Sequence, residues 1–439
     1  MGKPQLQLKS RVLQALLNRK DALVCLVNQG IVSVAGFATS VYIGQQSASE
    51  LGLYYIGLSL VLFARGFQQQ YVSTPYSIYL PRQPDEDRPG YRGSCLVQQF
   101  GFVIITLIYL LAQILAAYAG WISVELVSSL LVLLVFLPAI LLRELVRHYC
   151  FTHSENRGVM GVDIAISVLQ IVALVGLGYF GFLTAATAWC AIGISTILSI
   201  GYWYLRRGPK IKFQRERFPK DWKLNWSFGK WAVAGQFVGS LPSYLLPLML
   251  LQSATTEELG SERTGYFAAC MTLVGVANIF NMGMLNFLTP RAAKVFLHEG
   301  SAGLKRLLLQ MYGLFLIAVG GFAIFLVFFG SFVTVKIFGP EYAGLQTALI
   351  LLAVAKLLEG FSHTASGGLF AMEKIKANFF VDVILMVITI TAAVVLIYSY
   401  GVVGAAWTTL IGSLTCAILR SGLLFKFLAE SKVKGTSDV

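Results

Sequence analysis

The chain has 439 residues, of which 56% are apolar and only 13% are charged, against about 25% charged residues in an ordinary soluble domain. With a mean hydropathy of +0.72, it has too few polar side chains to cover its surface, which excludes a soluble globular protein, a disordered chain and a disulfide scaffold. The formal net charge is +13, and its distribution along the chain is more informative than its sum.

Apolar runs of helical length recur along the whole chain, each long enough to cross the roughly 30 Å hydrocarbon core of a bilayer. The runs are continuous rather than alternating, which favours helices over barrel strands. We expect no cleavable signal peptide in the polar, basic residues 1–22, whose leucines and lysines are compatible with a short surface helix. Twelve spans are predicted, at 23–43, 51–80, 95–119, 123–150, 159–180, 183–206, 228–252, 264–289, 309–333, 343–370, 378–399 and 403–427.

Basic residues alternate between the two sides of these spans. With the N-terminus inside, 30 of the 34 Lys and Arg residues fall in segments predicted to be cytoplasmic. Arg263 and Lys336 fall in outward loops, and Arg65 and Lys356 lie inside spans. This bias predicts a multi-pass protein of the inner or plasma membrane with both termini in the cytoplasm.

The most basic connection, residues 206–230, interleaves basic and aromatic side chains. We interpret it as an interfacial linker that contacts anionic lipid headgroups rather than as a nucleic-acid patch. It separates two halves that resemble each other: Ser59–Gln68 matches Thr272–Asn281, and Asp163 and Asp382 hold equivalent positions.

Each half holds six spans and therefore enters the membrane in the same sense. The sequence thus predicts an all-α fold of about twelve transmembrane helices in two six-helix lobes. A pseudo-two-fold axis along the membrane normal would relate the lobes, with a substrate site between them. The alternative is that similar apolar helices align by chance. The predicted parts are an N-terminal segment 1–22, an N-lobe 23–206, a linker 207–227, a C-lobe 228–428 and a tail 429–439.

Polar residues inside the spans are the candidate site residues, because polar groups are costly in lipid. Arg65 lies near the middle of the second span, which also carries several glutamines and Pro75, so this helix is predicted to be polar on one side and bent. Arg65 either lines a wet cavity or caps carbonyls of a broken helix, and interhelical hydrogen bonding is the alternative for the amides. The residues predicted to line the substrate cavity are Arg65, Gln68, Asn28, Gln29, Gln236, Asn278, Asn281 and Lys356.

Lys356, Glu359 and His363 have helical spacings of three and four and therefore share one stripe of the tenth span. Glu359 and His363 are candidates for ion coupling, and a buried, self-paired stripe is the alternative. Arg143, Arg147, Asp163 and Asp382 lie near the cytoplasmic ends of their spans. They are candidates for a cytoplasmic gate of ion pairs between helices, or are ordinary interfacial charges.

Catalytic patterns are not evident. The histidines at the cytoplasmic edge have no ligand-spaced partners, and the sequence contains no G-x-x-x-x-G-K-[ST] motif for ATP. We therefore expect neither an enzyme nor a bound cofactor or metal.

Two runs resemble a known family. The run Arg143–Ile171 resembles the region of the fourth and fifth spans in polysaccharide transport proteins. The run Gly265–Gly300 resembles them as well, with its Asn-rich helix leading into Pro-Arg and a basic loop. On these runs the chain is similar to the Wzx-type flippases of the multidrug/oligosaccharidyl-lipid/polysaccharide exporter superfamily.

The resemblance implies two lobes around a cavity that opens alternately to each side. It also implies movement of polyprenyl-diphosphate-linked glycans to the outer leaflet, for cell-surface polysaccharides such as lipopolysaccharide. The implied partners are the bilayer, the lipid-linked glycan, H⁺ or Na⁺ and other polysaccharide-assembly membrane proteins, with no nucleic acid.

Three rival functions stay open. A drug or organic-cation antiporter of the same superfamily is expected to carry a carboxylate in the first or seventh span, where this sequence has only Asn28, Gln29 and Gln236. A membrane glycosyltransferase, polymerase or ligase is disfavoured by the short outward loops. A non-transporting scaffold has no need of charge at the midplane.

Overall fold

The computed structural model describes residues 24, 27–153 and 155–437. These residues are helical apart from short connections, and no strand occurs among them, which confirms the predicted all-α class. They divide into two compact units. Unit 1 comprises the described residues of Met1–Thr39 with Phe67–Ala112 and Leu130–Lys230, and unit 2 comprises Ser40–Gly66, Gln113–Ser129 and the described residues of Trp231–Val439.

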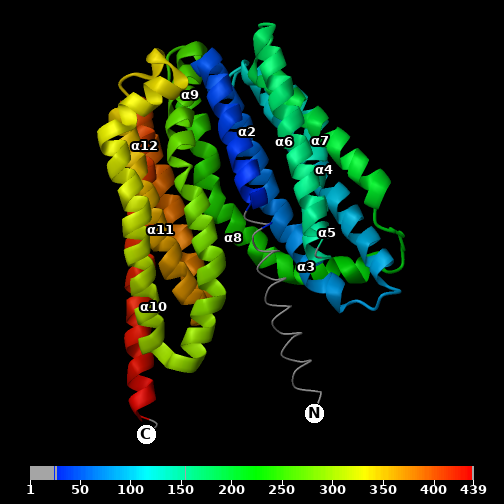
Figure 1. The fold of residues 1–439 in the computed structure, drawn as a ribbon, viewed down its shortest axis with the longest axis vertical. Coiled ribbons are helices and arrows are strands. Elements are labelled where there is room, and N and C mark those ends of the chain that lie inside the picture. The colour runs from blue at the N-terminus through cyan, green and yellow to red at the C-terminus, as the bar shows by residue number, and fades with distance from the viewer. Residues whose placement is uncertain (1–23, 25–26, 154, 438–439) are drawn as a thin grey trace, which may run out of the picture. The chain divides into compact units, whose positions relative to one another are not determined.

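Unit 1 contains the greater part of α4 (Arg88–Tyr118) and α5 (Leu126–Thr152) together with α6 (Asn156–Tyr179) and α7 (Ala185–Arg207). The last two lie side by side (Figure 1). A turn joins them, and α7 begins where the Thr184 side chain accepts a hydrogen bond from the Thr187 N–H. The core beneath them is apolar and contains Cys150, Val159, Ile166, Ile200 and Trp203.

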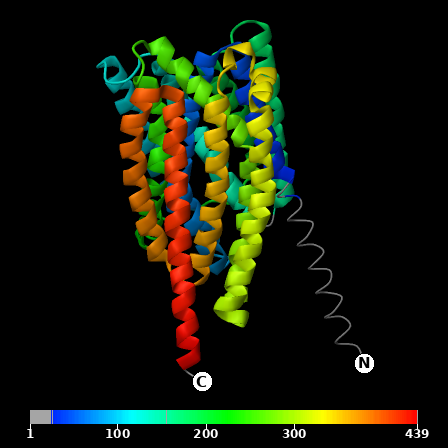
Figure 2. The same ribbon diagram turned by 90° about the vertical axis from the view of Figure 1, so that its left-hand side faces the viewer.

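Unit 2 contains α9 (Glu257–Val274), α10 (Ala277–Phe338), α11 (Gln346–Ala371) and α12 (Ile375–Ser437). The long helices α10 and α12 are hairpins, because the backbone leaves helical geometry at Gly300 and at Gly401. Figure 2 shows the orange and red halves of α12 running alongside each other. Helix α11 packs against both hairpins, and Leu308, Leu369 and Leu424 meet in the core.

Nine helical segments of the described residues are long and apolar enough to cross a membrane. The hairpin α12 supplies two spans, α9 and the first half of α10 form a further one, and residues 27–46 form the first. Each of the twelve predicted spans is therefore helical over most of its described residues, with an interruption at Gly275 and Val276 in the eighth span. The chain is an integral multi-pass membrane protein.

The second span bends where its sequence is polar. Helix α2 (Ala48–Gln68) passes into a π-helix over Gln69–Ser73 and then into α3 (Thr74–Tyr79) and a 3₁₀ turn over Leu80–Arg82. Pro75 stands at the start of α3. Since proline has no N–H and its ring displaces a preceding carbonyl, the local change from α to π geometry is the expected result.

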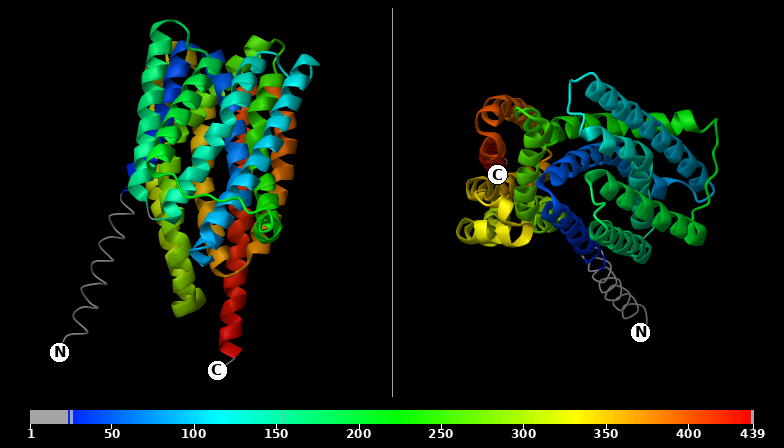
Figure 3. Two further views of the ribbon diagram at one scale, coloured as in Figure 1. Left: turned by 90° about the vertical axis from the view of Figure 1, so that its right-hand side faces the viewer. Right: turned by 90° about the horizontal axis from the view of Figure 1, so that it is seen from above.

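Helix α8 (Phe218–Gln252) begins within the predicted linker rather than after it. Its first turns are anchored in unit 1, because the buried Asn225 accepts a hydrogen bond from the Tyr91 hydroxyl (2.8 Å) and donates one to Gln98 (3.0 Å). The remaining connection, drawn in green between α7 and α8 in Figure 3, contacts the start of α4 through a hydrogen bond from the Lys212 N–H to the Pro89 carbonyl (3.0 Å).

The surface helix predicted within residues 1–22 lies outside the described residues. The lobe boundaries at 206 and 228, and the symmetry that would relate the lobes, stay predictions.

Candidate functional site

Asp163 on α6 is the centre of a buried polar group in unit 1. Its side chain has no exposed surface. Arg143 donates two hydrogen bonds to Oδ1, at 2.7 Å from Nη2 and 3.1 Å from Nε. Arg147 Nε lies 3.4 Å from Oδ2, and Asn28 Nδ2 donates to the same oxygen at 2.7 Å. Both carboxylate oxygens therefore have charged or polar partners.

Helical geometry explains why two arginines reach one carboxylate. Arg143 and Arg147 are four residues apart on α5 and so lie on the same face, one turn apart. Glu144 lies 3.7 Å from Arg147 and adds a second carboxylate to the group. In a low-dielectric setting such a group stays together, because removing one partner leaves an uncompensated charge.

The structure thus brings three of the four predicted gate residues together and joins Asn28, which was predicted to line the cavity, to them. A gating role for Arg143, Arg147 and Asp163 stays a prediction. The fourth, Asp382, belongs to unit 2.

The stripe on α11 is self-paired in unit 2. Lys356 Nζ lies 2.6 Å from Glu359 Oε2, and His363 Nε2 lies 3.4 Å from Glu359 Oε1. The lysine side chain is 11% exposed, whereas Glu359 and His363 keep about a third of their side-chain surface exposed, at 34% and 32%. Glu359 therefore links the Lys356 ammonium to the partly exposed His363 imidazole.

Asp382 pairs with an arginine that the sequence analysis did not select. Arg420 Nη2 lies 2.6 Å from Asp382 Oδ1, and its Nη1 donates to the Ser362 hydroxyl at 3.0 Å. Ser362 precedes His363 on α11, so both halves of α12 and the charged face of α11 meet here. The signal was visible in the sequence, because Arg420 lies inside the span predicted at 403–427 but was counted with the cytoplasmic charges.

The other candidates for the cavity occupy different environments. Gln68 is fully buried in unit 1 and donates to the Leu141 carbonyl (2.7 Å). Asn281 is buried in unit 2, and within the described part of the chain neither atom of its amide has a hydrogen-bond partner. Gln29 and Asn278 are exposed, Arg65 and Gln236 are half-buried, and Gln236 donates to the Ser240 hydroxyl (3.2 Å). Whether these residues line one cavity stays a prediction.

Among the residues that the structure describes, no group of three or more His, Cys, Asp and Glu side chains is arranged to hold a metal ion.

Comparisons with known proteins identify the fold of this chain. No protein-family model matches the sequence, and no curated protein matches it. Solved structures match over nearly the whole chain. One is the inward-facing conformation of a multidrug resistance MATE family transporter of the MOP superfamily, with a TM-score of 0.77, 15% identity, and coverage of 91% of this chain and 95% of that one.

A second match is the lipid II flippase MurJ in an inward closed conformation, with a TM-score of 0.70, 15% identity, and coverage of 94% of this chain and 91% of that one. The chain has the MATE and MurJ transporter fold. A MOP superfamily transporter from Pyrococcus furiosus, described as having a binding pocket of reverse polarity, shares this fold with a TM-score of 0.64, 15% identity, and coverage of 93% and 95%.

The MATE and MurJ fold is a transporter fold rather than an enzyme fold in all three of these structures. The shared fold, at 15% identity, does not identify the substrate of this chain.

Proposed function

We propose that this protein is a flippase that moves a lipid-linked, anionic oligosaccharide between the leaflets of a membrane by alternating access. The observation that carries the proposal is the sign of the charge in the spans. Arg65 lies half-buried in the central part of the 35-residue span Ala48–Arg82, whereas the first and seventh spans, at 27–46 and 228–252, contain no carboxylate.

A cation in mid-span suits an anionic substrate. A diphosphate and acidic sugars gain charge-assisted hydrogen bonds from a guanidinium, which also presents its donors in a fixed fork. An organic cation is repelled by the same group. Lys356 is a further cation inside a span, and Glu359 partly neutralises it.

Glu359 and His363 are the proposed coupling groups. Protonation of the His363 imidazole adds a positive charge beside Glu359. The Glu359 carboxylate is then shared between two cations, so its ion pair with Lys356 becomes weaker. An inward proton gradient can thereby change the charge that Lys356 presents to the substrate. Na⁺ is the alternative coupling ion.

Reconstitution tests the proposal directly. The purified chain is placed in liposomes with a fluorescent polyprenyl-diphosphate glycan, and leaflet exchange is measured with and without a proton or Na⁺ gradient. Exchange that requires the protein and rises with one of the gradients supports the flippase. Exchange no faster than in protein-free liposomes contradicts it.

The Arg65→Ala variant tests the residue. We expect loss of surface polysaccharide at an unchanged level of the protein in the membrane, because the substrate loses its cationic partner in mid-membrane. Arg82→Ala, which removes an exposed arginine from the end of the same span, is the matched control and is expected to keep normal output. Normal polysaccharide in cells with Arg65→Ala removes Arg65 from the mechanism.

A drug antiporter of the MATE type is the second candidate, favoured by the TM-score of 0.77 to the multidrug transporter. It predicts export of fluorescent organic cations from cells. If cells export such cations and the purified chain does not exchange the lipid-linked glycan, the antiporter function is supported over the flippase function.

A further inference from the structure

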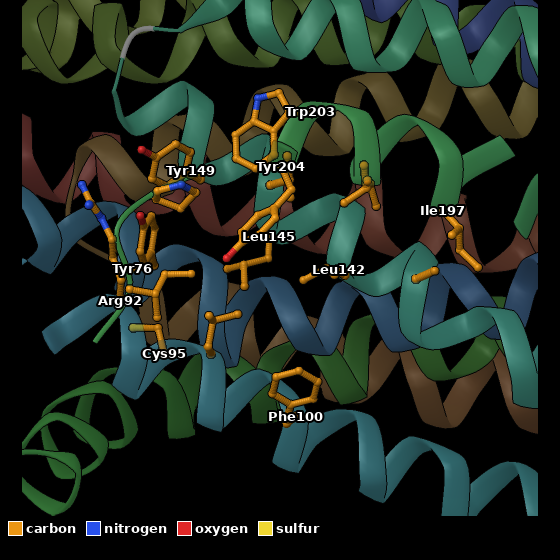
Figure 4. A pocket seen from close by; sticks show the side chains of 17 residues that line it. Tyr76, Arg92, Cys95, Phe100, Leu142, Leu145, Tyr149, Ile197, Trp203 and Tyr204 are labelled. Carbon is orange, nitrogen blue, oxygen red and sulfur yellow. The ribbon is translucent and has the colours of Figure 1, made fainter. Parts of the chain in front are cut away.

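A groove in unit 1 lies at the end where α4 begins and α5 and α7 end, and Tyr76 of α3 and the connection after α7 also line it. Its volume is about 440 Å³, which falls in the range of sites that hold one small molecule or chain. Its walls are almost wholly apolar and include Leu142, Leu145 and Ile200. Figure 4 shows Arg92, Tyr76 and Tyr149 gathered at one end and Ile197 at the other.

Arg92 is held at the polar end by three contacts. Its Nη2 donates to His153 Nε2 at 2.8 Å, its Nη1 donates to the Lys210 carbonyl at 3.4 Å, and its guanidinium lies 5.4 Å from the centre of the Tyr149 ring. His153 Nδ1 lies 2.9 Å from the Tyr149 carbonyl. Both contacts are satisfied by an imidazole that donates from Nδ1 and accepts at Nε2.

These contacts leave the charge of Arg92 uncompensated. Its partners are the His153 imidazole, the Lys210 carbonyl, the Tyr76 hydroxyl and the Tyr149 ring, and none of the ion pairs found among the described residues involves Arg92. Its Nε is buried without a hydrogen-bond partner among those residues. The nearby connection adds the cations of Lys210 and Lys212, both on residues 208–217.

The apolar part of the groove opens sideways. Phe100, Ile197 and Tyr204 line it and are exposed, at 61%, 47% and 54%. All three belong to helices that are long and apolar enough to span a membrane. A hydrocarbon chain can therefore enter from the surrounding lipid without crossing water.

We propose that this groove binds one acyl chain of a phospholipid whose anionic phosphodiester headgroup contacts Arg92. Charge complementarity selects the occupant, because the apolar walls accept a chain and the uncompensated guanidinium requires an anion at its end. The lipid is a structural ligand of unit 1 and is separate from the transported substrate.

Gly201 on α7 supplies a clean means of closing the groove. It lines the groove and is exposed, and a Cβ built there meets nothing within 4 Å. Gly201→Leu therefore fills the groove without a clash with the backbone. Gly176→Leu is the matched control, since Gly176 lies on α6 outside the groove and also has open space around it.

The test uses the full chain, purified and delipidated in detergent. Native mass spectrometry measures the affinity for phosphatidylglycerol, for phosphatidylcholine with the same chains, for a polyprenyl phosphate and for inorganic phosphate. We expect phosphatidylglycerol to bind about tenfold more tightly than phosphatidylcholine. Both lipids carry the phosphodiester, but the quaternary ammonium of phosphatidylcholine is repelled by Arg92 and by the nearby Lys210 and Lys212. Arg92→Gln is expected to abolish that difference, Gly201→Leu to weaken both lipids about tenfold, and Gly176→Leu to change neither.

Equal affinity of the unsubstituted chain for the two phospholipids overturns the proposal, as does unchanged binding to Gly201→Leu. Displacement of phosphatidylglycerol by inorganic phosphate shows that the groove holds no chain. Tighter binding of the polyprenyl phosphate overturns the phospholipid as the occupant. The Gly201 variants and the comparison of lipids on the unsubstituted chain decide the matter even where Arg92→Gln fails to fold.

Discussion

At the scale of single residues, three carboxylates inside the predicted spans are each held by a cation. Asp163 has no exposed surface but is held by Asn28, Arg143 and Arg147. Asp382 is held by Arg420, and Glu359 by Lys356. A buried ion pair adds little net stability, but breaking one is expensive.

The Asp163 group leads to a prediction on stability. Arg143→Leu is expected to destabilise the protein by about 3 kcal/mol, because the buried carboxylate loses its two-hydrogen-bond partner and keeps only Arg147 and Asn28. The measurement is the apparent melting temperature in detergent at a fixed scan rate.

Two variants control for this effect. Arg143→Leu combined with Asp163→Leu is expected to be more stable than Arg143→Leu alone, since no unpaired charge remains. Asp85→Asn, in an exposed pair with Arg88, is expected to change stability by no more than about 0.5 kcal/mol. A double variant as unstable as the single one contradicts the pairing argument.

Glu125 leads to a prediction on pH dependence. It lies in the turn before α5, where burial raises its pKa and the charges of Glu257, Glu258 and Glu50 raise it further. The folded chain therefore holds this proton more tightly than the unfolded chain does. The carboxyl destabilises the fold once the pH rises above the window between its ordinary and its raised pKa.

Glu125→Gln is accordingly expected to raise the apparent melting temperature at pH 8 and to leave it almost unchanged at pH 4. The exposed Glu86→Gln serves as the control and is expected to have no effect at either pH. A Glu125→Gln variant that is less stable than the unsubstituted chain at pH 8 shows that the carboxylate is stabilising after all.

At the scale of secondary-structure elements, two glycines turn long apolar runs into hairpins. Gly300 has φ 64° and ψ −157°, and Gly401 has φ 54° and ψ −126°. Side chains with a Cβ rarely adopt these backbone angles. Each glycine therefore allows two neighbouring spans to reverse direction with almost no connecting loop.

Gly300→Ala is expected to destabilise the protein by about 1–3 kcal/mol. The cost is purely one of backbone strain, because a Cβ at this position meets nothing within 4 Å. Gly313→Ala on the same helix, where the backbone is helical and the space is also open, is expected to be neutral or to stabilise by about 0.5–1 kcal/mol. Equal melting temperatures for the two variants rule out strain at Gly300.

At the scale of the whole molecule, the distribution of basic residues predicts the orientation in the membrane. Thirty of 34 Lys and Arg residues fall in alternate connections or near the span ends that adjoin them, and the predicted twelve spans place both termini on the same side. The longest of these connections in the structure, between α7 and α8, is predicted to be cytoplasmic.

Two introduced cysteines test this orientation. We expect a membrane-impermeant maleimide to label Glu341→Cys in intact cells, because Glu341 is exposed in the connection between α10 and α11 that is predicted to face outward. Lys210→Cys, exposed between α7 and α8, is expected to react only after permeabilisation. Labelling of the unsubstituted chain controls for the native cysteines. The reverse labelling pattern would show that the orientation in the membrane is opposite to the predicted one.

Several features followed from the sequence because they depend on neighbours along one chain. A span of about twenty apolar residues satisfies its own backbone hydrogen bonds, so the number of helices could be predicted from the positions of the apolar runs. The stripe of Lys356, Glu359 and His363 could be predicted for the same reason, since spacings of three and four on one helix leave no other arrangement. The bend at Pro75 is equally local.

Contacts between helices required the tertiary structure. Asn28 and Asp163 are 135 residues apart, and the sequence alone does not indicate that Arg420 contacts Asp382. The sequence does not single out Arg92, because its proposed role in binding lipid depends on the α5 and α7 side chains beside it. Which residue a polar side chain meets depends on the rotation of each helix about its axis and on the axial offset between helices. Both are decided by packing between segments distant in the sequence, which hydrophobic periodicity does not encode.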